Sequence, residues 1–286
     1  MFEWILIIVA LVGSAIAGFV DLKTTEIPDE IPYIMMGVGI IAHIIESIVL
    51  SSYNPILYSA IAGFGFLLFG FFMYYTGQWG GGDAKLLSAL GFLLPTLSSK
   101  FSAKLFFPFS LSLFFNVFFI GAIYMIVYAI VLAFIEKKIW YTFVHELRAN
   151  SKILVILNVA VFILLIGFGV LAIKHFFTIS FLDLLKIEIK IILLSIGLFL
   201  VWRFSKTVEE VGFKKKIPVS HLKVGDVLLD SKLWEGLTKE QIKEIKKSGK
   251  KYVWIKEGVR FGLAFPLALI FTLLIGDGII LLINLI

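Results

Sequence analysis

Apolar runs of membrane-spanning length alternate with short polar breaks along most of this 286-residue chain. A helix needs about 20 mostly apolar residues to cross the hydrocarbon core of a bilayer. The pattern predicts seven or eight spans, because 86–97 is short enough to be partial or broken. The candidate spans are 3–20, 31–50, 57–76, 86–97, 105–135, 152–173, 187–203 and 260–284. The first run lacks a basic start and a small-residue cleavage site, so we expect a retained helix rather than a signal peptide.

A long polar stretch, 204–258, interrupts this pattern and reads as a small soluble domain. Thr238-Lys-Glu-Gln241 fits a capping box and Gly249 a helix stop, which predicts a helix over 239–248. Alternation over Lys251–Lys256 favours a strand, and Gly225-Asp226 favours a turn. The predicted fold class is therefore an all-α polytopic membrane protein with a small α+β cytoplasmic domain.

This pattern divides the chain into four parts. We expect a membrane-embedded core, further transmembrane helices, the cytoplasmic domain and a C-terminal transmembrane helix. Their bounds are 1–135, 136–203, 204–258 and 259–286, in that order.

Composition supports the membrane class and narrows the chemistry. The chain is 60% hydrophobic and 16% charged, with a mean hydropathy of +1.01, which excludes an ordinary soluble fold and a disordered chain. It contains no cysteine, so disulfides, thiol catalysis, iron–sulfur clusters and cysteine zinc sites are excluded. Four histidines leave little scope for a histidine metal centre, and we expect no metal and no cofactor.

The net charge is +6, and the distribution of lysines and arginines among the loops predicts the orientation in the membrane. With the N-terminus outside, the inner loops hold 21 of the 26 lysines and arginines and the outer loops hold five. Basic residues concentrate on the cytoplasmic side of membrane proteins, which favours this orientation. The basic charge of 204–258 suits anionic lipid headgroups, and we expect membrane lipids rather than nucleic acid as its partner.

Two acids stand out as candidates for chemistry, because a carboxylate at membrane depth is costly and usually functional. Asp21 directly follows the first apolar run, and Asp83 lies between the third and fourth runs. Two crossings separate them, and an even number of crossings puts both on the same membrane face. Alone, each has a plain structural explanation, as an acid at a helix end or in a capping turn.

The sequence around Asp83 is Gly80-Gly81-Gly82-Asp83-Ala84-Lys85. Three glycines allow close backbone approach and an abrupt helix start, so Asp83 should lie near a helix N-terminus, where a carboxylate is favoured. Irregular backbone at this depth requires burial in protein or a wet cavity. Two carboxylates in a wet cleft suit an aspartyl protease, since their mutual repulsion separates their pKa values and keeps one protonated.

These residues resemble the type IV prepilin peptidases, a family of GxGD intramembrane aspartyl proteases. The stretch 80–85 fits the family's GxGDxK pattern, and Asp21, Lys23 and Ile27-Pro28 resemble its first motif. The order and spacing of the motifs match across roughly 1–135. The tail, with Leu222-Lys-Val-Gly225-Asp226-Val, looks like the archaeal branch that includes the preflagellin peptidases.

The resemblance implies that Asp21 and Asp83 are the catalytic pair. It implies archaeal preflagellin or prepilin precursors as substrates, cut after a short basic leader at the cytoplasmic face. Gly80 and Gly82 would be structural, and Lys23 would accompany the first motif. Lys85 would hold a carboxylate ionised, position the loop or snorkel to the interface. The cysteine-bearing zinc domain and methyltransferase activity of the bacterial branch are not supported, since cysteine is absent.

Three alternatives remain at this point. The same two acids could bind cations or relay protons in a transporter, which should show an inverted repeat and polar residues on several spans. A presenilin-like protease would carry a mid-helix Tyr-Asp pair and a Pro-Ala-Leu motif, and neither is present. A non-catalytic scaffold would use 204–258 as its binding module.

Overall fold

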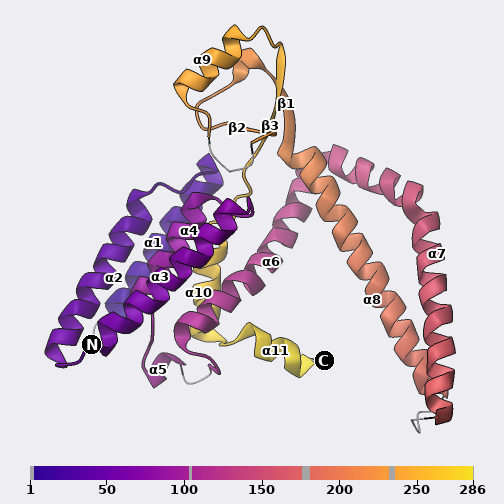
Figure 1. Cartoon of the computed structure of the whole chain (residues 1–286), viewed down its shortest axis with the longest axis horizontal. Helices are drawn as coiled ribbons and strands as arrows, with labels where there is room; N and C mark the ends of the chain where they lie inside the picture. Colours follow the sequence, from indigo (N-terminus) through magenta and orange to yellow (C-terminus); the bar gives the residue numbers. More distant parts are fainter. Residues whose placement is uncertain (1–2, 103–104, 176–180, 232–235, 286) are drawn as a thin grey trace. The chain divides into compact units, whose positions relative to one another are not determined.

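The computed structural model describes residues 3–102, 105–175, 181–231 and 236–285, and most of them are helical (Figure 1). The chain divides into two compact units, one comprising Met1–Tyr128 with Lys215–Ile286 and the other Ala129–Lys214. The helices of the first unit are α1 (Glu3–Thr24), α2 (Glu30–Val49), α3 (Asn54–Tyr75), α4 (Gly81–Leu93), α5 (Ser99–Ser102), α6 (Phe109–Ile135, whose last turns belong to the second unit), α9 (Lys239–Lys247), α10 (Ala264–Leu274) and α11 (Gly278–Leu285).

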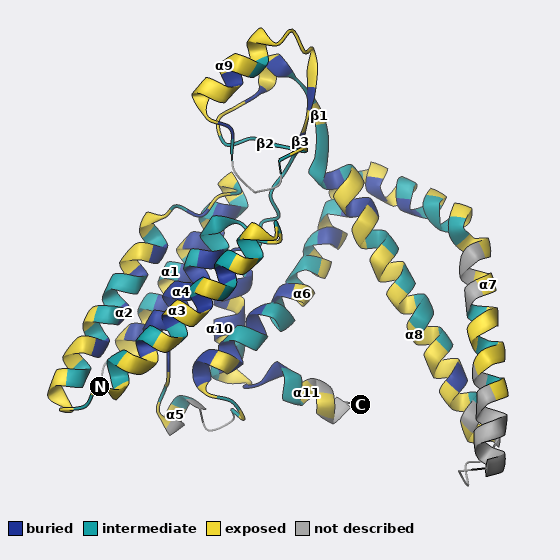
Figure 2. Cartoon of the chain, in the orientation of Figure 1, coloured by how far each residue is buried: buried dark blue, intermediate teal, exposed yellow. Residues whose placement is uncertain are grey.

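The buried centre of the first unit is α4, which α1, α2 and α3 surround (Figure 2). The neighbouring helices can pack this closely on α4 because glycines lie at the crossings. A Cβ at Gly70 of α3 would lie 2.7 Å from Ala84 Cα, and a Cβ at Gly39 of α2 would lie 2.7 Å from the Phe92 carbonyl oxygen. Small residues at such crossings are typical of helices packed within membranes. At 1.5 Å per residue, α4 is about 20 Å long, which is too short to cross a hydrocarbon core of about 30 Å by itself; that the fourth run is a partial span stays a prediction.

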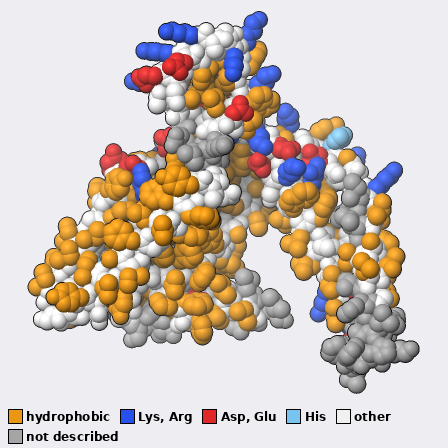
Figure 3. Space-filling view, viewed as in Figure 1, with side chains coloured by type: hydrophobic (Ala, Val, Ile, Leu, Met, Phe, Trp, Pro, Cys, Tyr) orange, Lys and Arg blue, Asp and Glu red, His pale blue; other side chains and the backbone are white. Residues whose placement is uncertain are grey.

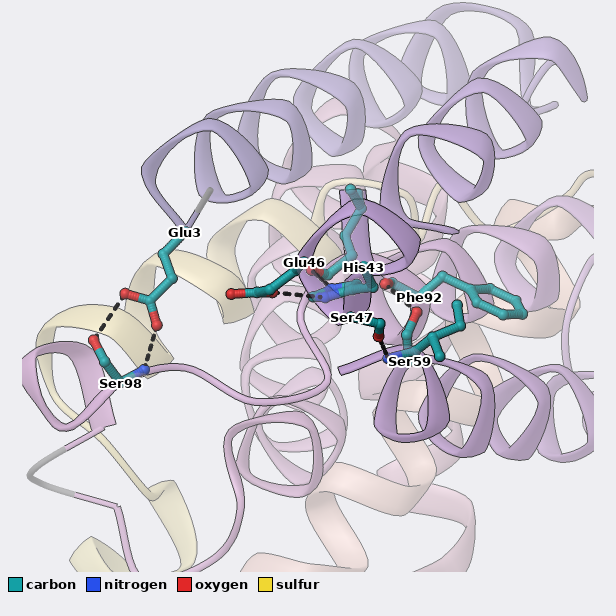
Figure 4. A network of polar contacts seen from close by, with 9 residues as sticks. Glu3, His43, Glu46, Ser47, Ser59, Phe92 and Ser98 are labelled. Carbon is teal, nitrogen blue, oxygen red and sulfur yellow. Dashed lines mark hydrogen bonds and ion pairs between the residues drawn. The ribbon is translucent and has the colours of Figure 1, made fainter. Parts of the chain in front are cut away.

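The C-terminal end of α4 is closed by side chains from its neighbours (Figure 4). Ser59 Oγ donates to the Phe92 carbonyl at 2.7 Å, and His43 Nε2 lies 3.2 Å from the Leu93 carbonyl oxygen. Glu46 Oε2 lies 3.3 Å from His43 Nδ1. These contacts satisfy helix-end carbonyls that would otherwise be buried without a partner, so His43 is a capping residue.

Four of the described helices, α1, α2, α3 and α6, are long and apolar enough to cross a membrane. Their outward side chains are large and hydrophobic; examples are Ile41, Ile48, Phe64 and Leu68. Figure 3 shows hydrophobic side chains covering this part of the molecule, whereas charged side chains gather over α9 and the strands beside it. The chain is thus a membrane protein, and the total of seven or eight spans stays a prediction.

The prediction of one continuous C-terminal helix, over 260–284 within the part 259–286, is wrong about its continuity. The segment forms two helices, because α10 ends at Leu274 and α11 begins at Gly278. Gly276 has φ 108°, which a helix cannot contain. The buried Asn116 of α6 stabilises the break: its amide donates to the Gly276 carbonyl at 2.8 Å and its Oδ1 accepts from Gly278 N at 2.9 Å.

The soluble part contains three strands, β1 (Lys214–Pro218), β2 (Val227–Leu228) and β3 (Tyr252–Lys256), in the order β1-β3-β2. β2 and β3 are antiparallel, with Val227 opposite Lys256. Helix α9 starts with the expected capping box, in which Thr238 N donates to Gln241 Oε1 at 2.8 Å. The predicted helix and strand are confirmed. A separate core holds this part together and consists of Val219, Leu222, Leu237, Ile242, Val253 and Ile255.

The second unit is a helical hairpin of α7 (Lys137–His175) and α8 (Phe181–Thr207), which continues into a π-helix over Val208–Phe213. The predicted spans 152–173 and 187–203 lie within these two longer helices. An ion pair of 3.0 Å between Arg203 Nη2 and Glu146 Oε2 joins the helices, and Thr207 donates to the same carboxylate at 3.0 Å.

Candidate active site

Asp21 lies in the last turn of α1, immediately before the chain leaves the helix. Thr25 ends the helix in a left-handed conformation, φ 62°, and its N–H donates to the Asp21 carbonyl at 2.8 Å. The Asp21 side chain is only 4% exposed. Its Oδ2 accepts a hydrogen bond of 2.8 Å from the backbone N–H of Gly262, which lies between β3 and α10.

Asp83 is the third residue of α4, so the expectation of an acid near a helix N-terminus is confirmed. Gly80 precedes the helix in an extended conformation, φ −73° and ψ 155°. Asp83 Oδ2 accepts a hydrogen bond of 3.3 Å from Gly80 N, one of the backbone N–H groups at the start of the helix that have no carbonyl partner within it. The positive end of the helix dipole adds to this stabilisation of the carboxylate.

The glycines before Asp83 bring the two acidic motifs together. A Cβ at Gly82 would lie 2.7 Å from Ile27 Cβ, which is too close for any side chain there. Ile27 follows Asp21 in the connection from α1 to α2, so the two motifs are in direct contact through Gly82. A Cβ at Gly81 would instead meet Tyr74 at an ordinary 3.8 Å.

Asp21 and Asp83 line the same cavity, whose volume is about 710 Å³. The structure thus brings two acids from distant stretches of chain to one cavity. Charged and polar groups make this cavity suitable for water and for a peptide; its other charged lining residues are Lys23, Glu26, Lys223, Asp226, Lys256, Glu257 and Arg260.

Lys85 is not among the residues that line this cavity, and it binds Asp29 at the start of α2. Its Nζ lies 2.6 Å from Asp29 Oδ1 and 5.4 Å from the centre of the Tyr33 ring. Of the three roles considered for Lys85, this geometry favours positioning of the loop. Lys23 is exposed in the last turn of α1, where its charge complements the C-terminal end of the helix.

We expect the Lys85–Asp29 ion pair to contribute little to the free energy of unfolding. The Lys85 side chain is 20% exposed and that of Asp29 54%, and ion pairs so accessible to water are worth about 0.2–1 kcal/mol. Lys85→Met, Asp29→Asn and the double variant should each lose under about 1 kcal/mol of unfolding free energy, measured by thermal unfolding in detergent. A Lys85→Met chain that loses all activity while staying folded would instead place Lys85 in the chemistry.

Arg260 lines this cavity and Gly262 borders it at Asp21, and neither was among the predicted site residues. The signal available was weak: two glycines, at 258 and 262, bracket an arginine just before an apolar run. Within the described residues, no group of three or more His, Asp or Glu side chains is placed to hold a metal ion.

Comparison with known proteins gives three consistent matches. Residues 6–135 match the type IV leader peptidase family. The prepilin peptidase EppA of Methanothermobacter thermautotrophicus is 23% identical over 145 residues, 48% of this chain. The preflagellin peptidase of Methanococcus maripaludis is 37% identical over 89 residues, 31% of this chain. Each match spans 38% of the relative's own length. The resemblance of this chain to the type IV leader peptidases is therefore confirmed over residues 6–135.

Proposed function

We propose that this chain is a membrane aspartyl endopeptidase that removes the short basic leader from archaeal preflagellin or prepilin precursors. Asp21 and Asp83 are its catalytic pair, and no cofactor takes part. One observation carries the proposal: two carboxylates from separate helices line one polar cavity, within the segment that resembles leader peptidases.

The pair can perform peptide hydrolysis without another group. Two carboxylates at close range resist ionising together, so one stays protonated. The ionised carboxylate takes a proton from a water molecule, whose oxygen attacks the scissile carbonyl carbon while the protonated carboxyl gives its proton to the carbonyl oxygen. In the resulting gem-diol, the newly protonated acid gives its proton to the amide nitrogen. The C–N bond breaks as a hydroxyl proton returns to the other carboxylate.

The lysine distribution supports a cytoplasmic site. With the N-terminus outside, the end of α1 and the start of α4 face the cytosol together with the basic soluble part. A cytosolic leader would then reach the cavity while the hydrophobic helix of the precursor stays in the bilayer. The basic soluble part would lie against anionic headgroups.

The transporter alternative fits the structure less well. A pathway for cations or protons needs polar groups beyond the two acids, but the next turns of α4 bury Leu86, Leu87 and Leu90 completely. The buried hydroxyl of Ser88 donates to the Gly63 carbonyl at 2.9 Å, so it serves helix packing.

The proposal is tested with the purified chain in lipid nanodiscs and a synthetic precursor carrying a basic leader, a glycine and a hydrophobic stretch. We expect one cut, between the leader and the hydrophobic stretch, detected by mass spectrometry. A matched precursor with its leader lysines changed to glutamine should be cut more slowly. An intact precursor, together with cation or proton flux in proteoliposomes, would replace the protease with the transporter.

A further inference from the structure

The connection between β3 and α10 lies against α1 exactly where Asp21 is. A Cβ at Gly262 would lie 3.0 Å from Asp21 Cβ and 3.0 Å from Gly18 Cα. A Cβ at Gly18 would lie 2.9 Å from the Leu263 backbone nitrogen. Glycine on both sides therefore lets the two backbones touch, and this contact is what allows the Gly262 amide to reach the Asp21 carboxylate.

Arg260 is held in place by two tyrosines of α6. The Tyr124 hydroxyl donates to the Arg260 carbonyl at 2.7 Å, and Arg260 Nη1 donates to the Tyr128 hydroxyl at 2.6 Å. Arg260 lines the same cavity as Asp21 and precedes the Gly262 amide that binds Asp21 by two residues. A positive charge is thus held in the lining of the cavity that contains the two acids.

Phe261 connects the same segment to the second acid. Its ring lies 5.9 Å from that of Trp79, centroid to centroid, and Trp79 immediately precedes Gly80. Residues 260–263, which we call the C-terminal strap, therefore contact α1, α6 and the turn before α4. The strap lies outside the segment 6–135 that resembles leader peptidases.

The two acids have different surroundings because of this strap. Asp21 accepts a hydrogen bond of 2.8 Å from Gly262 and shares the cavity lining with the Arg260 guanidinium; a donated hydrogen bond and a nearby cation both favour the ionised form of a carboxylate. Asp83 accepts a longer bond, 3.3 Å, from Gly80, and it shares the cavity with the second acid, Asp21. Like charge disfavours a second ionised carboxylate, although the dipole of α4 acts in the opposite direction.

We propose that the C-terminal strap is part of the proteolytic site and holds Asp21 as the ionised member of the pair, leaving Asp83 as the proton donor. This inference rests on the proposed function. Arg260 and Gly262 act through Asp21 and are positioning residues. The titratable groups around Asp21 include Asp83 from α4 and Arg260 from the strap, which line the same cavity, and Tyr124 of α6, which binds the Arg260 carbonyl. The other charged groups of the cavity are Lys23, Glu26, Lys223, Asp226, Lys256 and Glu257.

The pH profile of kcat/KM for precursor cleavage tests the charge. In Arg260→Gln, the acidic limb should move to higher pH by about one unit, because Asp21 loses the cation that favours its ionised form. Arg260→Lys keeps the charge, so the acidic limb of its pH profile should stay at the wild-type pH while kcat/KM falls several-fold. Tyr128→Phe removes the hydrogen bond to the guanidinium but leaves the charge in the cavity, so the acidic limb of that variant should also stay at the wild-type pH.

A glycine pair tests the contact. Gly262→Ala should reduce cleavage at least about ten-fold, since its Cβ would displace the strap from Asp21. Gly37→Ala of α2 is the control: nothing lies within 4 Å of an added Cβ there, Gly37 does not line the cavity, and cleavage should stay near wild type. Thermal unfolding of each variant in detergent separates loss of fold from loss of function.

The outcomes distinguish this inference from the proposed function. If the acidic limb of Arg260→Gln stays at the wild-type pH while Asp21→Asn and Asp83→Asn are inactive, the proposal for the strap fails and the proposed protease function remains. If folded Arg260→Gln and Arg260→Lys are both inactive, the charge is not what Asp21 requires and the proposal also fails. An inactive Arg260→Gln that Arg260→Lys restores supports it. Cleavage by either Asp variant overturns the protease itself.

Discussion

Asp21→Asn and Asp83→Asn are each expected to reduce precursor cleavage by about 100- to 10,000-fold, the usual contribution of a general acid or base. Asparagine keeps the size of the side chain and an oxygen that can accept the bonds from Gly262 or Gly80, so the fold should persist. It cannot exchange a proton with water or with the scissile carbonyl. The measurement is the rate of leader removal in nanodiscs, with thermal unfolding as the test of fold.

Asp277→Asn is the matched control for the pair. Asp277 also lies between two glycines and is buried, but it accepts from the backbone N–H of Phe106 and does not line the cavity. An asparagine oxygen can accept the same bond, and cleavage should remain close to wild type. Wild-type cleavage by Asp21→Asn or Asp83→Asn would end the two-carboxylate mechanism, whatever Asp277→Asn does.

Gly82→Ala is expected to reduce cleavage by about 100-fold, although it changes no polar group. Its Cβ would lie 2.7 Å from Ile27 Cβ, so the connection from α1 to α2 must move away from α4. Ile27 follows Asp21 closely, and a displacement of about 1 Å between reacting groups can cost about 100-fold in rate. Overpacking should also lower the free energy of unfolding by about 1–3 kcal/mol.

Gly81→Ala is the neighbouring control, since an added Cβ there meets only Tyr74, at 3.8 Å. It occupies the first position of α4, where alanine is a good helix former. This variant should keep most of the wild-type cleavage rate and stability. Equal losses in both variants would mean that the loop needs glycine for backbone freedom rather than for the contact with Ile27.

The helices that could be predicted from the sequence are those set by neighbouring residues, through apolar runs, turn residues and caps. The first three spans follow from apolar runs bounded by turn residues, and the structure places helices close to the expected bounds. The capping box at Thr238 predicted the start of α9. The predicted span 105–135 begins later, at Phe109, because Pro108 lacks the N–H that a continuing helix needs. The boundaries of the four predicted parts stay a prediction.

The remaining features depend on long-range contacts that leave little trace in sequence. The break between α10 and α11 depends on Gly276 together with Asn116, 160 residues away, and hydrophobicity alone suggested one continuous helix. The parity of the crossings put Asp21 and Asp83 on one face, but nothing nearby indicated Gly262. The catalytic roles of the two acids stay a proposal, because geometry places groups without showing that they react.

The hydrogen bond between Gly262 and Asp21 has a consequence for biosynthesis. Asp21 leaves the ribosome well before its partner, which lies 241 residues later. During translation, α1 to α4 can insert and pack while this wall of the cavity is still missing. The growing polypeptide therefore completes the surroundings of Asp21 only after these 241 further residues have been made, which keeps the proposed dyad unfinished while the first helices insert.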